Sequence, residues 1–212
     1  PIIGIEAYVA PESRFDKRRV KWADGGEDDV SGGGAYTHMT LLAENNEGLS
    51  NLFKLSSLAS LEGYYYKPRM DRDLLSKYGK GLIATTGCPG GEIQTRLRMG
   101  AYKEAKQAAS ELRDIFGAEN FYLEIMDHGI DIETRVKADL LKLGKELGLP
   151  LLATNDLHYT HHEDAASHEA LLCVQSGSTL ADPKRFKFEN NEFYLKSAQE
   201  MRKLFSDIPE AC

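Results

Sequence analysis

The sequence predicts an α/β fold, and three patterns support this prediction. Short apolar runs typical of buried strands recur along the chain. Segments with an apolar residue at every third or fourth position, which are typical of helices, lie between several of these runs. In the second half of the chain the two patterns alternate at short intervals, as they do in right-handed strand–helix–strand units.

Five runs are predicted to be strands, at residues 2–9, 36–43, 81–86, 121–125 and 151–154. Most of them are almost continuously apolar, which favours a parallel sheet covered on both faces. An eight-stranded parallel barrel needs about 250 residues, so five strands are too few to close one. Either the sheet is open or its leading strands are missing, and because the chain opens directly on an apolar run we expect the second.

Helices are predicted for residues 49–56, 102–116 and 136–147. Polar residues at 45–47 can cap the first helix, Gly117 ends the second, and Gly148 followed by Pro150 ends the third. The segment 24–34 is rich in glycine and acidic side chains, which predicts an exposed loop.

Composition excludes several classes of protein. The 212 residues are 42% hydrophobic and 28% charged, which is typical of a globular chain, and no apolar run approaches the ~20 residues of a membrane helix. A net charge of −7 argues against a broad, nonspecific nucleic-acid surface, although bound cations can reverse the local field. The three irregularly spaced cysteines are no disulfide framework and predict a reducing cytoplasm.

Side chains that can bind a metal follow three successive predicted strands. Cys88 follows the run 81–86, Asp127 and His128 follow the run 121–125, and Asp156 and His158 follow the run 151–154. The carboxyl ends of parallel strands gather functional groups at one edge of a sheet. Two further candidates, Glu6 and His38, lie inside the first two runs, where a titratable side chain is costly unless it is paired or binds a metal.

Oxygen, nitrogen and sulfur donors together suit zinc or a similar divalent ion. Such an ion lowers the pKa of bound water to about 7, and paired ions suit the cleavage of phosphate esters. Each candidate also has a simpler interpretation: Cys88 as a small buried residue, His38 as a satisfied core imidazole, and Glu6 as the partner of a Lys or Arg. The Asp-x-His spacing of Asp156 and His158 is weak by itself.

Other polar segments have simpler interpretations as well. We expect His161, His162 and His168 to be solvated. The segment 63–72, GYYYKPRMDR, mixes aromatic rings with Lys67 and two arginines, and it is either a loop facing phosphates or bases or a packed aromatic loop with solvated charges.

Six ordered segments resemble one known family: THMTLLAENNEGLSNLFKLSS, EGYYYKPRMD, TGCPGGE, FYLEIMDHG, GLPLLATNDLHY and FYLKSAQEM. They resemble the polymerase-and-histidinol-phosphatase (PHP) domain of the bacterial DNA polymerase III alpha subunits, the C-family replicative polymerases. The resemblance extends over nearly the whole chain. It implies an incomplete, PHP-type distorted (β/α)7 barrel that lacks its N-terminal strands, with residues 1–197 as the PHP domain and residues 198–212 as the start of the connection to a polymerase core.

The resemblance also implies a metal cluster. Family members hold up to three ions with nine ligands in four motifs, and this chain matches five of the nine positions: Glu6, His38, Cys88, Asp156 and His158. The family's first His-x-His pair and its next histidine motif have no counterpart here. Zinc is the expected ion, with manganese or magnesium as alternatives.

The function that this resemblance implies is metal-dependent 3′–5′ exonuclease proofreading within a DNA-directed DNA polymerase. Glu6 and Asp156 would be catalytic, and His128 would contact the scissile phosphate. Expected partners are primer–template DNA, the sliding clamp and a separate exonuclease subunit, with no membrane. Two alternatives stay open: a non-catalytic domain that braces the polymerase and contacts replisome subunits, and a stand-alone phosphoesterase. Without the missing ligands we expect this chain alone to be inactive, with a weak partial site formed by Glu6, His38 and Cys88.

Overall fold

The computed structural model describes residues 1–20 and 31–212 and divides the chain into two compact units. The first unit consists of Pro1–Ile125 and Arg135–Leu152, and the second consists of Met126–Thr134 and Ala153–Cys212. Of the predicted loop at residues 24–34, residues 24–30 are outside the described part of the chain. Residues Ser31–Gly34 form a short 3-10 helix.

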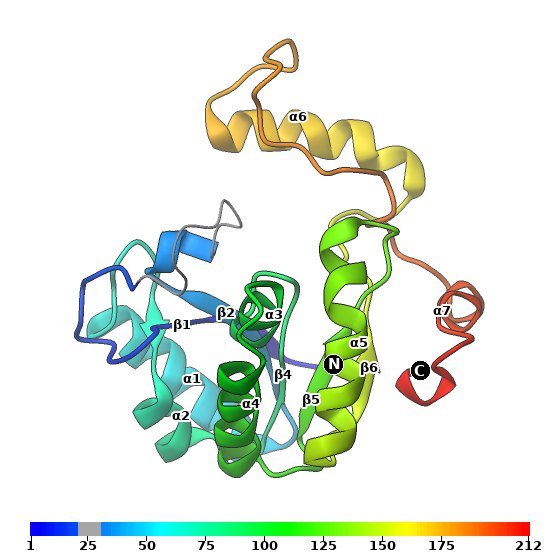
Figure 1. The fold of residues 1–212 in the computed structure, drawn as a ribbon. Helices are drawn as coiled ribbons and strands as arrows, with labels where there is room; N and C mark the ends of the chain where they lie inside the picture. Colours follow the sequence, from blue (N-terminus) through cyan, green and yellow to red (C-terminus); the bar gives the residue numbers. More distant parts are fainter. Residues whose placement is uncertain (21–30) are drawn as a thin grey trace. The chain divides into compact units, whose positions relative to one another are not determined.

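A six-stranded sheet in the order β3-β1-β2-β4-β5-β6 forms the centre of the first unit (Figure 1). Its strands are β1 Gly4–Val9, β2 Thr37–Ala43, β3 Arg69–Met70, β4 Leu82–Thr85, β5 Phe121–Ile125 and β6 Leu151–Ala153. All five predicted strands are confirmed, and only β3, with two residues, was not predicted. In the described part of the chain β3 and β6 are the edge strands, so the sheet is open and does not close into a barrel.

The predicted direction of one strand is wrong, because β2 runs antiparallel to both β1 and β4. Only the β1–β3 and β4–β5 pairs have registers that confirm parallel pairing. Burial along β2 alternates, since Thr37, Met39 and Leu41 are buried while His38 and Thr40 are partly accessible. This alternation is typical of a strand that has only one face against the core.

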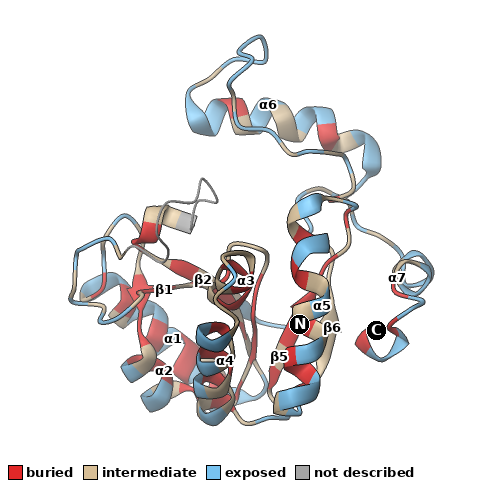
Figure 2. Ribbon diagram, in the orientation of Figure 1, coloured by how far each residue is buried: buried red, intermediate tan, exposed pale blue. Residues whose placement is uncertain are grey.

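Five helices pack against one face of the sheet: α1 Asn46–Leu61, α2 Arg72–Tyr78, α3 Glu92–Arg98, α4 Tyr102–Phe116 and α5 Asp131–Leu147. Their apolar residues form one cluster with alternate residues of the strands, and Figure 2 shows these buried positions along the inner sides of the helices. The predicted α4 and α5 are confirmed, α1 is longer than predicted, and α2 and α3 were not predicted. Within the described residues, no helix has both the length and the apolar character that a membrane crossing requires.

The strand residues that point away from this cluster form what we call the polar face of the sheet. By register and alternation it includes Glu6, Tyr8, His38, Thr40, Thr85 and Glu124. Glu124 is buried and accepts a hydrogen bond from the Thr85 hydroxyl, while its backbone N–H donates to the Thr86 hydroxyl. Two of the predicted metal ligands, Glu6 and His38, therefore lie on the face opposite the helices.

The second unit contains α6 Ala165–Ser176, α7 Ala198–Leu204 and the 3-10 helices His162–Asp164 and Pro209–Ala211. Helix α7 begins at a capping box in which Ser197 and Glu200 bond each other's backbone N–H groups. The predicted domain boundary at residue 197 falls inside this unit and stays a prediction.

Candidate metal site

The pairing of β1 with β2 places Glu6 beside His38 on the polar face. Tyr8 lies directly opposite His38 and Glu6 opposite Thr40, so Glu6 and His38 are diagonal neighbours on two antiparallel strands. The Nε2 atom of His38 is 3.8 Å from the Oε1 atom of Glu6. The His38 side chain is 14% exposed and the Glu6 side chain 60% exposed, so the imidazole is held firmly while the carboxylate is free to adjust.

Cys88 reaches the same place from the turn between β4 and α3. Its Sγ atom lies 2.8 Å from Nε2 of His38. Two glycines allow this approach: Gly87 has a φ of 73°, and a Cβ atom at Gly91 would lie 2.2 Å from the Thr86 carbonyl oxygen. The Gly91 N–H donates to the Cys88 carbonyl at 2.8 Å, and the Gln94 side chain donates to the Gly87 carbonyl at 2.9 Å, so the turn is fixed from both sides.

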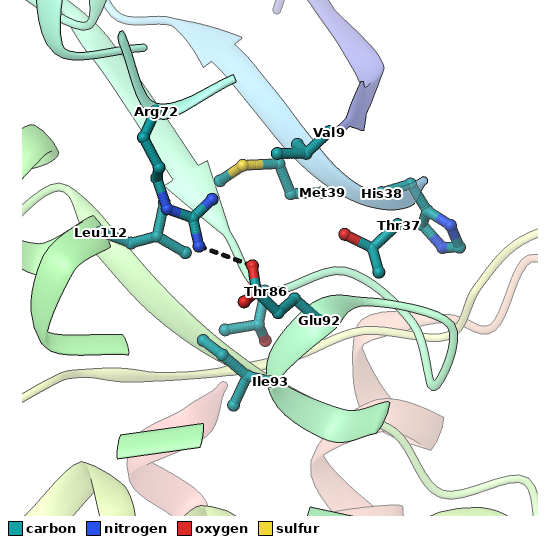
Figure 3. A pocket seen from close by; sticks show the side chains of 9 residues that line it. All are labelled: Val9, Thr37, His38, Met39, Arg72, Thr86, Glu92, Ile93 and Leu112. Atoms are coloured by element: carbon teal, nitrogen blue, oxygen red, sulfur yellow. Dashed lines mark hydrogen bonds and ion pairs between the residues drawn. The ribbon is translucent and has the colours of Figure 1, made fainter. Parts of the chain in front are cut away.

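An ion pair behind His38 supports this turn. Figure 3 shows a small cavity lined by Val9, Thr37, His38, Met39, Arg72, Thr86, Glu92, Ile93 and Leu112. Across it, the Arg72 guanidinium donates to the Glu92 carboxylate at 2.6 Å. Because Glu92 is the first residue of α3, this contact ties α3 to α2 and so helps to place Cys88.

Three of the predicted donors, Glu6, His38 and Cys88, are thus gathered from three separate segments. Among residues 1–20 and 31–212, no three His, Cys, Asp or Glu side chains form a finished metal site, so this is a loose cluster. Its atoms are nevertheless a carboxylate oxygen, an imidazole nitrogen and a sulfur, which is a donor set that zinc accepts. The chemistry of the three side chains therefore fits a divalent ion.

The other two predicted ligands, Asp156 and His158, lie in the second unit, in a loop that follows β6. Asp156 has a φ of 39°, an uncommon conformation for a residue with a side chain, and such outliers cluster at functional sites. The ring nitrogen Nδ1 of His158 lies 2.6 Å from the Asp156 carbonyl oxygen.

The segment around Phe193 braces this loop. The His158 backbone N–H donates to the Phe193 carbonyl at 2.9 Å, and the Asn155 side chain donates to the carbonyls of Glu192 and Tyr194 at 3.0 and 2.7 Å. The backbone carbonyls of Glu192, Phe193 and Tyr194 therefore hold the Asn155 side chain and the His158 backbone by hydrogen bonds.

His128 is buried, and both of its ring nitrogens are bonded. Nδ1 lies 2.5 Å from Glu133 Oε1, and Nε2 lies 2.9 Å from the Asn155 carbonyl oxygen. Its ring stacks on Phe193 with centroids 4.0 Å apart. Burial alone would lower the pKa of His128, but the bonds to Glu133 and Asn155 and the charges of Glu133 and Asp156 outweigh it, so the pKa is raised.

The prediction that His128 contacts a phosphate stays a prediction, and this geometry favours a different role. The imidazole holds the carbonyl of Asn155, the residue before Asp156. Sequence reasoning missed its supports Glu133, Asn155 and Phe193, although all three lie in or beside the segments that carry the family resemblance.

The remaining histidines fit the predictions in part. His161 and His162 are exposed, as expected. His168 is partly buried against Phe188, with ring centroids 4.9 Å apart, and burial together with nearby His158 lowers its pKa. The expectation that His168 is solvated is therefore wrong.

Comparison with known proteins identifies a family for this chain. The family model described as "PHP domain" matches residues 1–128. The chain is 58% identical over 216 residues to DNA polymerase III subunit alpha of Mycobacterium leprae and 60% identical over 221 residues to that of Saccharopolyspora erythraea. It is 45% identical over 211 residues to the same subunit of Thermus aquaticus.

These matches cover all of this chain but only 18%, 18% and 16% of the respective relatives, so the chain spans about a sixth of their length. Both the family model and the relatives cover the β1, β2 and β4 segments that gather Glu6, His38 and Cys88. The chain belongs to the PHP domain family.

Proposed function

We propose that this chain supplies the metal ligands of a 3′–5′ exonuclease that removes mispaired nucleotides within a replicative DNA polymerase. The observation that carries the proposal is the gathering of Glu6, His38 and Cys88 at one place on the polar face. The similarity to DNA polymerase III alpha subunits supports a polymerase as the setting.

The side chains would divide the work according to their surroundings. His38 and Cys88 are held by packing and by the glycine-rich turn, so they would fix the position of an ion. Glu6 is the more exposed of the three donors and has two carboxylate oxygens, which suits it to bridge two ions. Asp156 and His158 are proposed on sequence grounds to add further ligands from the second unit. A bound divalent ion, with zinc as the first candidate, would lower the pKa of a water molecule to about 7 and supply hydroxide at neutral pH.

Metal content and mismatch excision test this proposal in the natural polypeptide that carries the chain. We expect Cys88→Ser to release metal and slow excision roughly 10- to 100-fold, the range seen when even a supporting partner of a ligand is lost. Metal is measured by plasma mass spectrometry and excision on a primer with a mispaired 3′ end. Cys212→Ser is the matched control, because this thiol is exposed and far along the chain from the cluster.

A double variant tests the two predicted ligands in the second unit. Asp156→Asn combined with His158→Ala should lower both metal content and excision. Full metal content together with undiminished excision in Cys88→Ser would overturn the proposal.

A bracing or partner-binding role is the rival function, and one observation favours it. Helix α6 exposes Leu171 and Val174, which are 62% and 79% exposed, and apolar exposure of this kind is common at protein interfaces. Under this rival, Cys88→Ser lowers the melting temperature or the affinity for partner subunits while the excision rate is unchanged.

A further inference from the structure

The loop between α1 and β3 presents aromatic rings to solvent in a fixed way. Tyr64 and Tyr66 are 60% and 57% exposed, although large aromatic side chains are usually buried. Tyr66 sits at the tip of a tight turn in which the Tyr65 N–H donates to the Lys67 carbonyl at 3.0 Å. Its φ of 63° is unfavourable for a residue with a side chain, and such strain persists only where the surroundings enforce it.

Arg69, which is buried beneath the loop, stabilises this conformation. Its side chain is fully buried, and its guanidinium donates to the carbonyls of Gly63, Ala35, Arg14 and Asp16 at 2.8 to 3.1 Å. The same guanidinium lies 5.0 Å from the centre of the Tyr65 ring. Arg69 is therefore a structural clamp for the loop, and the exposed tyrosines gain their fixed position from it.

Basic side chains lie beside Tyr66 and next to it in sequence. The Arg19 guanidinium lies 5.1 Å from the centre of the Tyr66 ring and lowers the pKa of its hydroxyl through a hydrogen bond. Lys17 is also exposed on the neighbouring segment, where Arg18 is paired with Asp16, in a chain whose net charge is −7. The Lys67 ammonium lies 5.2 Å from the centre of the Tyr8 ring.

This group leads directly to the candidate metal site. Tyr8 lies opposite His38 in the β1–β2 register and two residues from Glu6 on the same face of the sheet. A cavity of about 130 Å³ is lined in part by Glu6 and Tyr8 of β1 and by Pro68, the residue that follows Lys67. Because Lys67 contacts the Tyr8 ring and Tyr8 lies opposite His38, a nucleic-acid strand bound by the loop would have its 3′ end near Glu6 and His38.

We propose that Tyr64, Tyr66, Lys67 and Arg19 form a stacking patch for the unpaired 3′-terminal bases of the nucleic-acid strand that is to be cleaved. Exposed aromatic rings interleaved with cations are what proteins use to hold single strands without reading their sequence. The patch takes bases on Tyr64 and Tyr66 and phosphates on Lys67 and Arg19. This inference rests on the proposed function, since it assigns the substrate strand of the same site.

Photo-crosslinking tests the patch without relying on catalysis. The natural polypeptide is irradiated in metal-free buffer with a single strand that carries 5-iododeoxyuridine at its 3′ end, and the modified peptide is mapped by mass spectrometry. We expect adducts on residues 63–67. Tyr66→Ala should reduce them and weaken capture of the mispaired end roughly 5- to 150-fold, as expected for the loss of one stacked base.

Two further variants control for damage to the fold and for loss of the hydroxyl. Tyr66→Phe keeps the ring and should retain the adducts. Phe53→Ala removes a ring that is 61% exposed on α1, outside the patch, and should change nothing. In steady-state excision assays Tyr66→Ala should raise KM and leave kcat near the parent value.

The outcomes separate this inference from the proposed function. Adducts on residues 63–67 without any excision would support the patch and overturn the exonuclease. Normal excision without adducts on this loop, or with adducts unchanged in Tyr66→Ala, would overturn the patch and leave the exonuclease standing. Absence of both adducts and excision would overturn both.

Discussion

His128 illustrates how a single buried residue can support the loop that carries a candidate ligand. Its imidazole connects Glu133, at the start of α5, with the Asn155 carbonyl. The loop that carries Asp156 is held in its unusual backbone conformation by this contact and by the bonds of the Asn155 amide. These contacts favour a positioning role for His128, while its predicted contact with a phosphate stays a prediction.

The raised pKa of His128 predicts a particular dependence of stability on pH. The folded state binds the His128 proton more tightly than the unfolded state does, so the extra stability is complete below the unfolded pKa of about 6.5. It is lost as the pH rises from there through the folded pKa, with a slope of at most about 1.4 kcal/mol per pH unit. Urea titrations across this range should show that the contribution of His128 to the free energy of unfolding falls as the pH rises, while His168, whose pKa is lowered, contributes with the opposite sign.

Variants identify the residue responsible for this slope. Relative to the parent chain, His128→Gln should remove the part of the slope that falls with rising pH, whereas His162→Gln, a change at an exposed histidine, should leave the slope unchanged. A pH profile that is the same in His128→Gln as in the parent chain contradicts this assignment.

At the scale of single elements, the start of α1 shows how backbone contact overrides helix propensity. Gly48 lies within the first turn of α1 and packs against the turn at Gly81, and a Cβ atom at Gly48 would lie 1.7 Å from the Gly81 carbonyl oxygen. The same oxygen accepts a hydrogen bond from the Glu44 N–H at 3.0 Å, so it cannot move away freely. The contact joins α1 to the strand β4 that follows Gly81.

Gly48→Ala should therefore destabilise the chain, although alanine is normally the better helix former by about 1 kcal/mol. We expect a loss of roughly 1–3 kcal/mol, the usual cost of overpacking, which corresponds to a fall of about 2–4 °C in melting temperature for each kcal/mol. Ser50→Ala, at an exposed position of the same helix, is the matched control and should raise the melting temperature slightly or leave it unchanged. A stabilised Gly48→Ala chain would refute this account.

The elements differ in how far sequence alone could predict them. Elements with a clear apolar pattern, such as the continuous run of β5 and the helical repeat of α4, were predicted to within a residue or two, because burial in the core dictates that pattern. Helices α2 and α3 have seven residues each, too few for a periodic pattern to stand out. The direction of β2 was missed because His38 was weighed as an isolated titratable residue, when together with Thr40 it marks the accessible face of an alternating strand.

The candidate site was predictable in its residue types and only partly in its geometry. Glu6, His38 and Cys88 could be picked out because titratable or thiol side chains stood in or directly after apolar runs. Their convergence depends on the antiparallel register and on the turn allowed by Gly87 and Gly91, which no local pattern reveals. The roles of Arg69 and His128 could not be predicted either, because each joins segments that are distant in sequence.

On the scale of the whole molecule, apolar burial is distributed very unevenly between the two units. The first unit contains the apolar cluster that joins the sheet to its five helices. In the second unit, α6 buries only Ala165 and Cys173 among its residues, while Leu171 and Val174 remain exposed. Segments with few buried apolar contacts open with a lower free energy than the core of the same protein.

Hydrogen exchange followed by mass spectrometry should resolve this difference within the 212-residue chain. We expect amides of α6 to exchange through local opening that costs much less free energy than opening of α4, a helix of comparable length that buries five side chains: Ala105, Ala108, Ala109, Leu112 and Phe116. Because α4 packs into the main apolar cluster, its slowest amides should exchange only through global unfolding. A change that raises the free energy of unfolding of the whole chain should therefore slow their exchange in proportion. Equal protection of α6 and α4 would mean that α6 gains its stability from contacts other than its own two buried residues, and the division into a firmly packed sheet unit and a loosely packed second unit would fail.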